Sequence, residues 1–346
     1  MAAPTASTLT SYGLGWPLTI GSGGSAATTN QRENLMDEIT LIDPTDVPTW
    51  QMLAKVQVDG PYVEWQIDSL AATATAGTYE GWEFDLTALS GRTRLSNVVQ
   101  YFATGFQVTR AEQLMSQRGL TAGVGGNEYR YQLGKKLKEL ARNMDARLVA
   151  VGTAVASASG ASGTAPRMAS LRAWADGSYP AISTTVSGAF ATGSFLNLRA
   201  AMDKAGADPD TLLVSTGVKA DVSILALGLN ATATNTSLRR FVQDASSKTL
   251  GGVIEIIEDD FGQIMIVRDR WMNQASATAA TTANAPFYLL FDRAKVQVGI
   301  FDAPHHTPLP PNGNHERGFI AAAITCKVAH PSALGFGHNV TTQIGN

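Results

Sequence analysis

The sequence predicts an α+β fold with four parts: a charge-free N-terminal arm, a protruding hairpin, one long helix, and a compact unit of alternating helices and strands. The long helix is the strongest local signal, because apolar residues over 128–156 recur at steps of three and four, which is the spacing of one helix face. After Gly193, short runs with helical and with strand spacing alternate. With 346 residues, the chain is long enough for two or three packed units.

The N-terminal arm is the first 31 residues, which contain no Asp, Glu, Lys or Arg. Disordered tails usually stay soluble through charge. This segment instead carries a series of large apolar side chains: Tyr12, Leu14, Trp16, Leu18 and Ile20. They predict an arm that lies on a surface, either a neighbouring subunit or its own, followed by a short helix over 31–40.

The predicted hairpin consists of two strand-like runs, 56–67 and 95–108, on either side of a long polar stretch over 68–91. A Gly60–Pro61 break interrupts the first run. Two strands with a long connection of this kind predict an extended hairpin that protrudes from the body.

The long helix is predicted to run over 128–156, about 40 Å at 1.5 Å per residue, and to act as a strut. Its core side is expected to hold Leu133, Leu137, Leu140 and Met144. The charged residues between Lys135 and Asp145 are expected on the other faces.

The compact unit after Gly193 is predicted to contain two helices and several strands. The helices are expected over 194–205 and 218–227. The strands are expected over 211–215, 253–257, 263–267, 287–291, 296–300 and 318–328, and the second and third form a hairpin about an Asp259–Gly262 turn.

Composition points equally to extensive self-association and to an ordinary bacterial protein rich in Ala, Thr and Gly, and it argues against nucleic-acid binding. Charged residues make up only 16% of the chain, well below the usual quarter, and interface cores are depleted in charge. The net charge of −3 argues against a surface built mainly to grip nucleic acid, which is normally basic. The first charged side chain is Arg32, so no secretory signal peptide is predicted, and no apolar run approaches the ~18 residues of a membrane span.

No catalytic, cofactor or metal site is predicted. The five histidines show no zinc-type spacing, and His305–His306 is expected in a solvated, proline-rich loop. The glycine cluster 123–126 lacks the Lys–Ser/Thr of a phosphate-binding loop. The acidic group over 255–260 lacks calcium-loop spacing. Cys326 is expected to be a buried apolar thiol.

Several segments, in one order along the chain, resemble the major capsid proteins of tailed bacteriophages with the Hong Kong ninety-seven fold. The similar segments are 63–70 with Glu80–Gly81, 94–100 with 106–109, 132–145, 167–171 with Trp174, 259–262 with 266–267 and 270–272, and 329–333. Each is short, and their shared order from Val63 to Ala333 carries the resemblance.

The resemblance implies the domains of that fold: an N-terminal arm (1–53), an E-loop hairpin (54–103), a P-domain with its spine helix (104–190), an A-domain (191–314), and a final P-domain strand that returns to the A-domain (315–346). It implies hexamers and pentamers in an icosahedral virion shell around double-stranded DNA, bound without sequence specificity, and assembled in the bacterial cytoplasm. It implies a structural protein, not an enzyme, with no cofactor and no membrane partner. Its other partners would be a portal protein and scaffold or decoration proteins.

Three alternatives stay open at this point: an encapsulin-like shell, another virion part such as a tail-tube subunit, and a soluble enzyme. The E-loop motif favours the phage over the encapsulin, and the long helix argues against the mostly β tail tube. The enzyme would need convergent polar groups that the sequence does not offer.

The predicted contacts between subunits lie in the arm and the E-loop. Some relatives join subunits through an E-loop lysine, but no lysine occurs between Lys55 and Lys135, so non-covalent contacts are expected. The candidates are aromatic anchors and arginines able to form forked hydrogen bonds: Trp16, Tyr79, Trp82, Phe84, Arg92 and Arg94.

Overall fold

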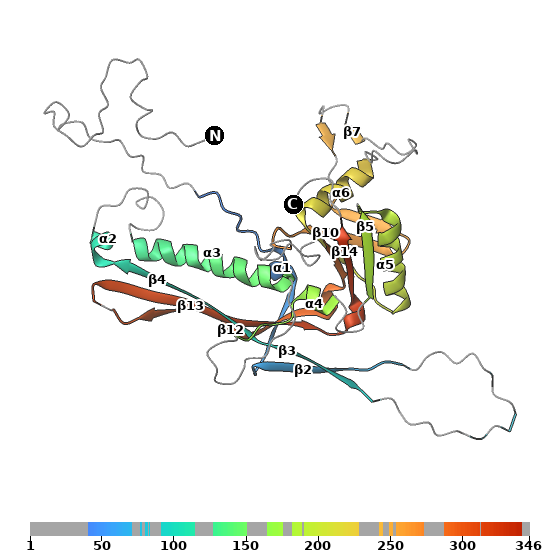
Figure 1. Cartoon of the computed structure of the whole chain (residues 1–346), viewed down its shortest axis with the longest axis horizontal. Coiled ribbons are helices and arrows are strands. Elements are labelled where there is room, and N and C mark those ends of the chain that lie inside the picture. Colours follow the sequence, from blue (N-terminus) through green and yellow to red (C-terminus); the bar gives the residue numbers. More distant parts are fainter. Residues whose placement is uncertain are drawn as a thin grey trace, which may run out of the picture.

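A computed structural model of the chain shows an elongated body with a compact unit at one end and a hairpin projecting from the body (Figure 1). It describes residues 41–70, 77, 80–81, 83, 91–114, 127–150, 165–175, 182–188, 190–227, 242–244, 249–251, 254–272, 287–311 and 313–340. The helix predicted over 31–40 lies outside these residues.

The body is built on a four-stranded sheet in the order β1-β12-β13-β4. Its strands are β1 (Ala54–Gln57), β12 (Val296–Leu309), β13 (His315–Val328) and β4 (Gln100–Thr109). β12 and β13 form a long antiparallel hairpin, β4 pairs antiparallel with β13, and β1 pairs parallel with β12. Helix α3 (Glu128–Val149) lies along this sheet (Figure 1).

Helix α3 confirms the predicted start of the spine helix but ends earlier than predicted. The Asn127 side chain accepts hydrogen bonds from the backbone N–H groups of Tyr129 and Arg130, which satisfies donors that a helix leaves free at its N-terminus. The helix ends at Val149, because Ala150 has extended backbone angles. Its 22 residues give a strut of about 33 Å.

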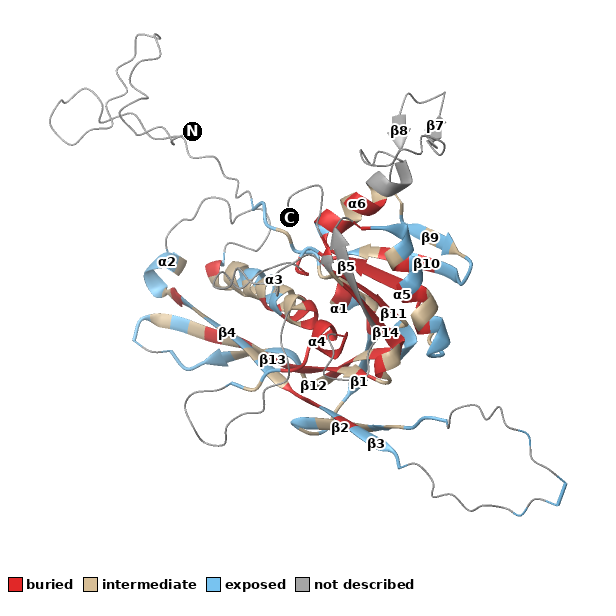
Figure 2. Ribbon diagram, turned by 45° about the vertical axis from the view of Figure 1, so that its right-hand side comes forward, coloured by how far each residue is buried: buried red, intermediate tan, exposed pale blue. Residues whose placement is uncertain are grey.

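The compact unit contains a six-stranded sheet in the order β5-β14-β11-β6-β10-β9. Its strands are β5 (Ile182–Gly188), β14 (Leu334–Val340), β11 (Tyr288–Phe291), β6 (Thr211–Val214), β10 (Gly262–Arg268) and β9 (Ile256–Asp259). The central strands β6 and β11 are buried along their whole length, as apolar runs covered on both faces should be. Helices α5 (Thr192–Lys204) and α6 (Thr216–Leu227) belong to this unit, and buried residues concentrate in it (Figure 2).

The projecting hairpin pairs β2 (Tyr62–Ile67) with β3 (Thr93–Val98) in antiparallel register, as predicted. The second predicted run is not one strand, however, because β3 and β4 are separated at Val99. The Val99 N–H bonds the carbonyl of Pro61, so the chain leaves the hairpin here and enters the long sheet.

Two strands pair in a different sheet from the one that the predicted domain boundaries imply. β12 was predicted with the A-domain segment, but it pairs with β13 and β1 in the long sheet. β5 was predicted with the P-domain segment, but it pairs with β14 in the six-stranded sheet. Both differences arise because a strand joins the sheet that holds its hydrogen-bonding partner, whatever its neighbours in sequence do.

The structure also contains short elements that the sequence did not predict. They are α1 (Pro48–Met52), α2 (Arg110–Leu114), α4 (Leu171–Ala175), two 3-10 turns (Arg293–Lys295 and Pro331–Ala333), and the strand pair β7 (Val242–Asp244) and β8 (Thr249–Gly251). Among the described residues, no helix is long and apolar enough to cross a membrane.

Candidate assembly interface

The root of the projecting hairpin is fixed to the core of its own subunit. The Trp65 ring lies 5.4 Å from the ring of Trp174 in the fully buried helix α4, and Ile67 packs on the same core. On the facing strand, Leu95 is buried. The hairpin therefore leaves the body in a fixed direction.

Asn97 holds the hairpin to two other segments. Its amide donates to the carbonyls of Ala169 (3.2 Å) and Cys326 (2.6 Å), and its side-chain oxygen accepts from the N–H groups of Ala169 and Val98, both at 2.8 Å. All four hydrogen bonds of a buried amide are thus made, which leaves no desolvated polar group uncompensated. Its place in the 94–100 segment was noted from the sequence, but its role was not.

The two predicted hairpin arginines pair with carboxylates of the same hairpin. Arg94 contacts Glu64 at 3.1 Å and Arg92 contacts Asp68 at 3.6 Å. Both pairs are exposed, so each contributes little to the stability of the subunit. Trp16, Tyr79, Trp82 and Phe84 lie outside the described residues.

The spine helix buries most but not all of its predicted core side. Leu140 and Met144 are buried, and Leu133 packs against the core from a half-buried position. Leu137 was predicted to face the core, but its side chain is 42% exposed. The sheet covers a narrower stripe of the helix than the three- and four-residue spacing suggests.

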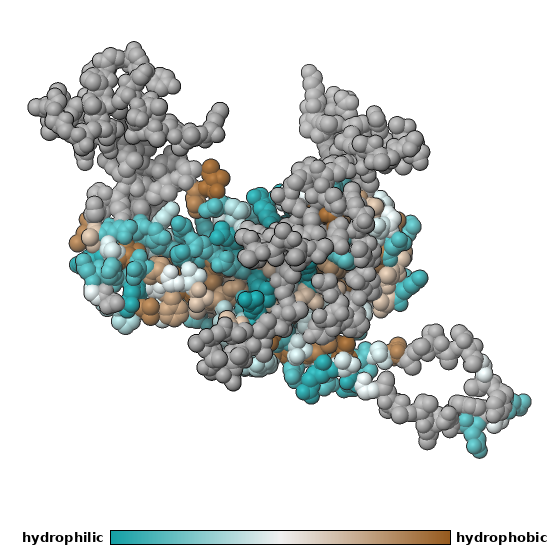
Figure 3. Space-filling view, in the orientation of Figure 1, coloured by the Kyte–Doolittle hydropathy of each residue, from teal (hydrophilic) through white to brown (hydrophobic). Residues whose placement is uncertain are grey.

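An apolar patch also lies above this helix where the described chain begins (Figure 3), and Leu41 and Ile42 are exposed there.

Asp145 is the second correction on this helix, because it was expected on a polar face and is fully buried. Its carboxyl group interacts with that of buried Asp269, which follows β10. Each carboxyl group also accepts from helix α1: Asp145 from the Trp50 N–H at 2.6 Å, and Asp269 from the Thr49 hydroxyl at 2.6 Å. The pair therefore joins the spine helix, the six-stranded unit and the segment that follows the arm.

Protonation of this carboxyl pair is shifted by its surroundings. Burial, and then the negative charge of Asp269, raise the pKa of Asp145 to about 8. Burial also raises the pKa of Asp269. Because two like charges cannot both be held in such a site, the pair carries a proton at neutral pH.

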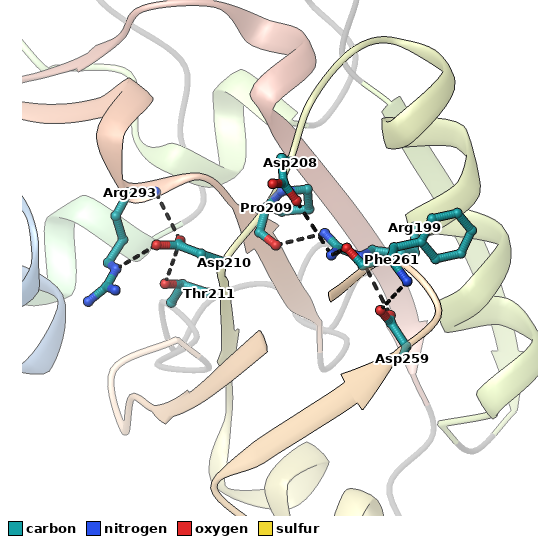
Figure 4. Close-up of polar contacts among 8 residues, drawn as sticks. All are labelled: Arg199, Asp208, Pro209, Asp210, Thr211, Asp259, Phe261 and Arg293. Carbon is teal, nitrogen blue, oxygen red and sulfur yellow. Dashed lines mark hydrogen bonds and ion pairs between the residues drawn. The ribbon is translucent and has the colours of Figure 1, made fainter. Parts of the chain in front are cut away.

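The six-stranded unit is braced by Arg199 of α5 (Figure 4). This buried guanidinium donates to the carbonyls of Pro209 (2.7 Å) and Phe261 (2.9 Å), and its Nε lies 3.5 Å from a carboxylate oxygen of Asp259. Asp208 lies 3.6 Å away on the exposed side. One arginine thus joins a helix, the β9–β10 turn and the turn before β6.

A second bridge in the same view joins Asp210 to Arg293 (Figure 4). Asp210 accepts from the Arg293 backbone N–H at 3.1 Å and from its Nε at 3.0 Å. Burial tends to raise the pKa of this carboxyl, but the hydrogen bonds and charge of Arg293 outweigh that effect and hold the pKa below its usual value. The bridge therefore involves an ionised carboxylate.

The structure contradicts the prediction for two histidines and agrees with the prediction for the cysteine. His305 and His306 were predicted in a loop, but both lie within β12, because its pairing with β13 continues to Leu309. Cys326 is fully buried, as predicted. Among the described residues, no group of three or more His, Cys, Asp or Glu side chains is placed to hold a metal ion.

Solved structures that this architecture resembles include phage capsids and an encapsulin. The cyanophage A-1(L) capsid subunit matches with a TM-score of 0.63 at 13% identity, over 90% of this chain and 98% of that chain. The capsid of cyanophage P-SCSP1u matches with a TM-score of 0.56 at 12% identity, over 99% and 100%. The SrpI encapsulin of Synechococcus elongatus PCC 7942 matches with a TM-score of 0.54 at 10% identity, over 93% and 96%. At these identities the likeness shows the fold, and the Hong Kong-type fold is confirmed.

The sequence comparisons identify the family. No curated protein sequence matches the chain significantly. The family model described as SU10 major capsid protein matches residues 21–341. Because this match spans most of the 346 residues, the chain belongs to the SU10 major capsid protein family.

Proposed function

We propose that this tailed-phage major capsid protein forms the hexamers and pentamers of an icosahedral head that encloses double-stranded DNA. One observation carries the proposal: the β2–β3 hairpin is fixed to the core at Trp65 and Asn97, yet its strands project from the body (Figure 1). A projection with a rigid root suits contact with another copy. Closed symmetry then reuses one such contact many times without open-ended growth.

In this proposal the parts of the fold take the roles of a capsid subunit. The β2–β3 hairpin is the E-loop, α3 with the long sheet is the P-domain, and the six-stranded unit is the A-domain that gathers about the capsomer axis. Residues 1–53 form the arm. Trp16, Tyr79, Trp82 and Phe84 anchor neighbouring subunits, and Arg92 and Arg94 add polar contacts around their own ion pairs.

The proposed partners are further copies of the chain, a portal protein, and scaffold or decoration proteins. DNA would be enclosed without sequence-specific contacts, which suits a net charge of −3. The role is structural rather than catalytic, and assembly takes place in the host cytoplasm.

The test is to purify assembled particles, treat them with nuclease, and measure the nucleic acid that stays protected. We expect double-stranded DNA inside a closed shell seen by electron microscopy. The likeness to an encapsulin supplies the competing outcome, because particles that contain a cargo protein and no nucleic acid would overturn the proposal. Particles disrupted before nuclease treatment are the control and should retain no DNA.

A further inference from the structure

The buried carboxyl pair of Asp145 and Asp269 lies against the single turn of helix α1, beside the end of α3 that is nearest the six-stranded unit (Figure 1). Oδ1 of Asp145 accepts from the Trp50 N–H, and Oδ2 of Asp269 accepts from the Thr49 hydroxyl, both at 2.6 Å. Oδ2 of Asp145 is buried and has no hydrogen-bond partner among the described residues. One short turn of helix therefore contacts both carboxyl groups.

Within the described part of the chain, these two hydrogen bonds are the only ones from α1 itself to another element. Trp50 and Met52 pack on the core from half-buried positions, and Leu53, which follows the helix, is buried. Before the helix, the Asp46 carbonyl accepts from Nε1 of Trp271 at 2.8 Å. The carboxyl pair is therefore the polar attachment of α1 to the rest of the subunit.

The two segments that supply the carboxyl groups are more firmly joined to each other than either is to α1. Met144 and Leu148 of α3 are buried in one core cluster with Trp271 and Met272, which follow Asp269. Separating these segments would expose that core to water. Displacing α1, a turn of five residues with Gln51 exposed, would admit water to the carboxyl pair at a smaller loss of buried apolar surface.

The charged groups around α1 do not compensate the carboxyl pair. The Lys55 amine donates to the Trp50 and Leu53 carbonyls. The Asp46 carboxylate pairs with Arg270 at 3.0 Å, and both side chains are about half exposed. Burial, and to a smaller extent the charge of Asp46, raise the pKa of Asp269.

The cations near the pair on the spine helix and on β10 are also placed elsewhere. Arg142 lies over the Trp271 ring, 5.5 Å from its centroid. Arg147 donates to the Gln100 side chain and the Met168 carbonyl, and Arg268 is exposed. Two ionised carboxylates at this site would thus meet no paired cation among the described residues, and an unpaired buried charge is strongly unfavourable.

We infer that the carboxyl pair is a proton-operated latch, which holds α1 on the junction of the spine helix and the six-stranded unit while it carries a proton, and releases α1 when both acids ionise. The latch belongs to the subunit, and its action does not depend on what the shell encloses.

The direction of the switch follows from the donors around the pair. A singly charged pair is stabilised by the Thr49 hydroxyl and by the N–H groups of Trp50 and Trp271. Burial, and then the charge of Asp269, raise the pKa of Asp145 to about 8. Helix α1 is therefore held below this pH and released as the pH rises through it.

Hydrogen–deuterium exchange of assembled particles, read by mass spectrometry, tests the latch. At pH 9 the peptide 46–53 of wild type should exchange about ten-fold faster than that of Asp145→Asn, because each pH unit above the pKa shifts such an equilibrium by up to about ten-fold. At pH 6 the two chains should exchange at equal rates. Comparing both chains at one pH cancels the intrinsic effect of pH on amide exchange. Returning wild-type particles to pH 6 should restore the protection.

The spine-helix peptide 136–144 is the internal control and should exchange alike in both chains at both pH values. Loss of protection in this peptide together with 46–53 would show unfolding of the whole subunit and would overturn the inference. Equal rates for 46–53 in both chains at pH 9 would show that the carboxyl pair does not control α1, which also overturns it. Neither result bears on whether the particles contain DNA.

Thr49→Val supplies an independent measurement, because it removes the hydroxyl that donates to Asp269. It should speed the exchange of 46–53 several-fold already at pH 6, while the spine-helix peptide stays protected. Thr45→Val, at an exposed threonine of the same segment, is the matched control and should leave the exchange unchanged. An unchanged 46–53 peptide in Thr49→Val would contradict the role of this hydrogen bond in holding α1.

Discussion

The carboxyl groups of Asp145 and Asp269, which are 124 positions apart in the sequence, interact inside the core where the spine helix meets the six-stranded unit. Trp50 and Thr49 of α1 bind the same two side chains. Three parts of the subunit therefore depend on one protonated pair of acids.

Raising the pH should destabilise the subunit through this pair. Asp145 binds its proton more tightly in the folded chain than in the unfolded chain, whose carboxyl has a pKa near 3.9. The stabilisation is fully present below that value and is lost as the pH rises through about 8. The slope for one proton is about 1.4 kcal/mol per pH unit.

Asp145→Asn tests this prediction, because an amide has nearly the shape of the protonated acid and does not titrate in this pH range. The variant should unfold at a higher urea concentration than wild type at pH 8 and at a similar concentration at pH 4. The exposed Asp260→Asn is the matched control and should leave the pH profile unchanged. An Asp145→Asn profile parallel to that of wild type would mean that the pair does not titrate in this range.

Arg199→Met should be strongly destabilising, since it leaves the nearly buried Asp259 carboxylate without its cation. Breaking a buried pair by removing one partner typically costs about 3–5 kcal/mol. Thermal unfolding of the six-stranded unit would report the loss. The contrasting variant is Arg94→Met in the exposed pair with Glu64, for which we expect about 1 kcal/mol or less. Similar losses from both variants would argue that the Arg199 network contributes no more than a surface ion pair.

Leu140→Ala and Leu137→Ala separate the two sides of the spine helix. Truncating buried Leu140 should cost about 2–5 kcal/mol of folding free energy and reduce assembled yield. Truncating the half-exposed Leu137 should change subunit stability by less than about 1 kcal/mol. Lys138→Ala, on the exposed face, should be nearly silent in both respects. Denaturant unfolding and sedimentation measure the two effects, and equal losses from both leucines would mean that the helix face is assigned wrongly.

Mature particles should dissociate into single chains when boiled in detergent with reductant. The reason is that no lysine amine lies between Lys55 and Lys135, and a guanidinium that stays protonated is a poor nucleophile for an isopeptide bond. A denaturing gel should show one band near 36.5 kDa. A ladder of larger bands that survives reduction would establish covalent joining and contradict this prediction.

Several parts of the fold were predictable because their signal is local. The apolar spacing of the spine helix, the paired runs of the hairpin, and the short apolar strands of the compact unit each reflect neighbours in sequence, and each is present in the structure. The contact residues of the arm and hairpin apex stay predictions, because the described structure does not include them.

The sequence by itself determined the main elements, since helical and strand periodicity record which side chains share a face. Only the tertiary structure decided what covers each face. It left Leu137 half exposed, buried Asp145 against Asp269, and placed β12 and β5 in sheets other than those expected. The physical reason is that these outcomes depend on contacts between distant segments, such as the Thr49 to Asp269 hydrogen bond across 220 positions. The periodicity within either segment carries no information about such a partner.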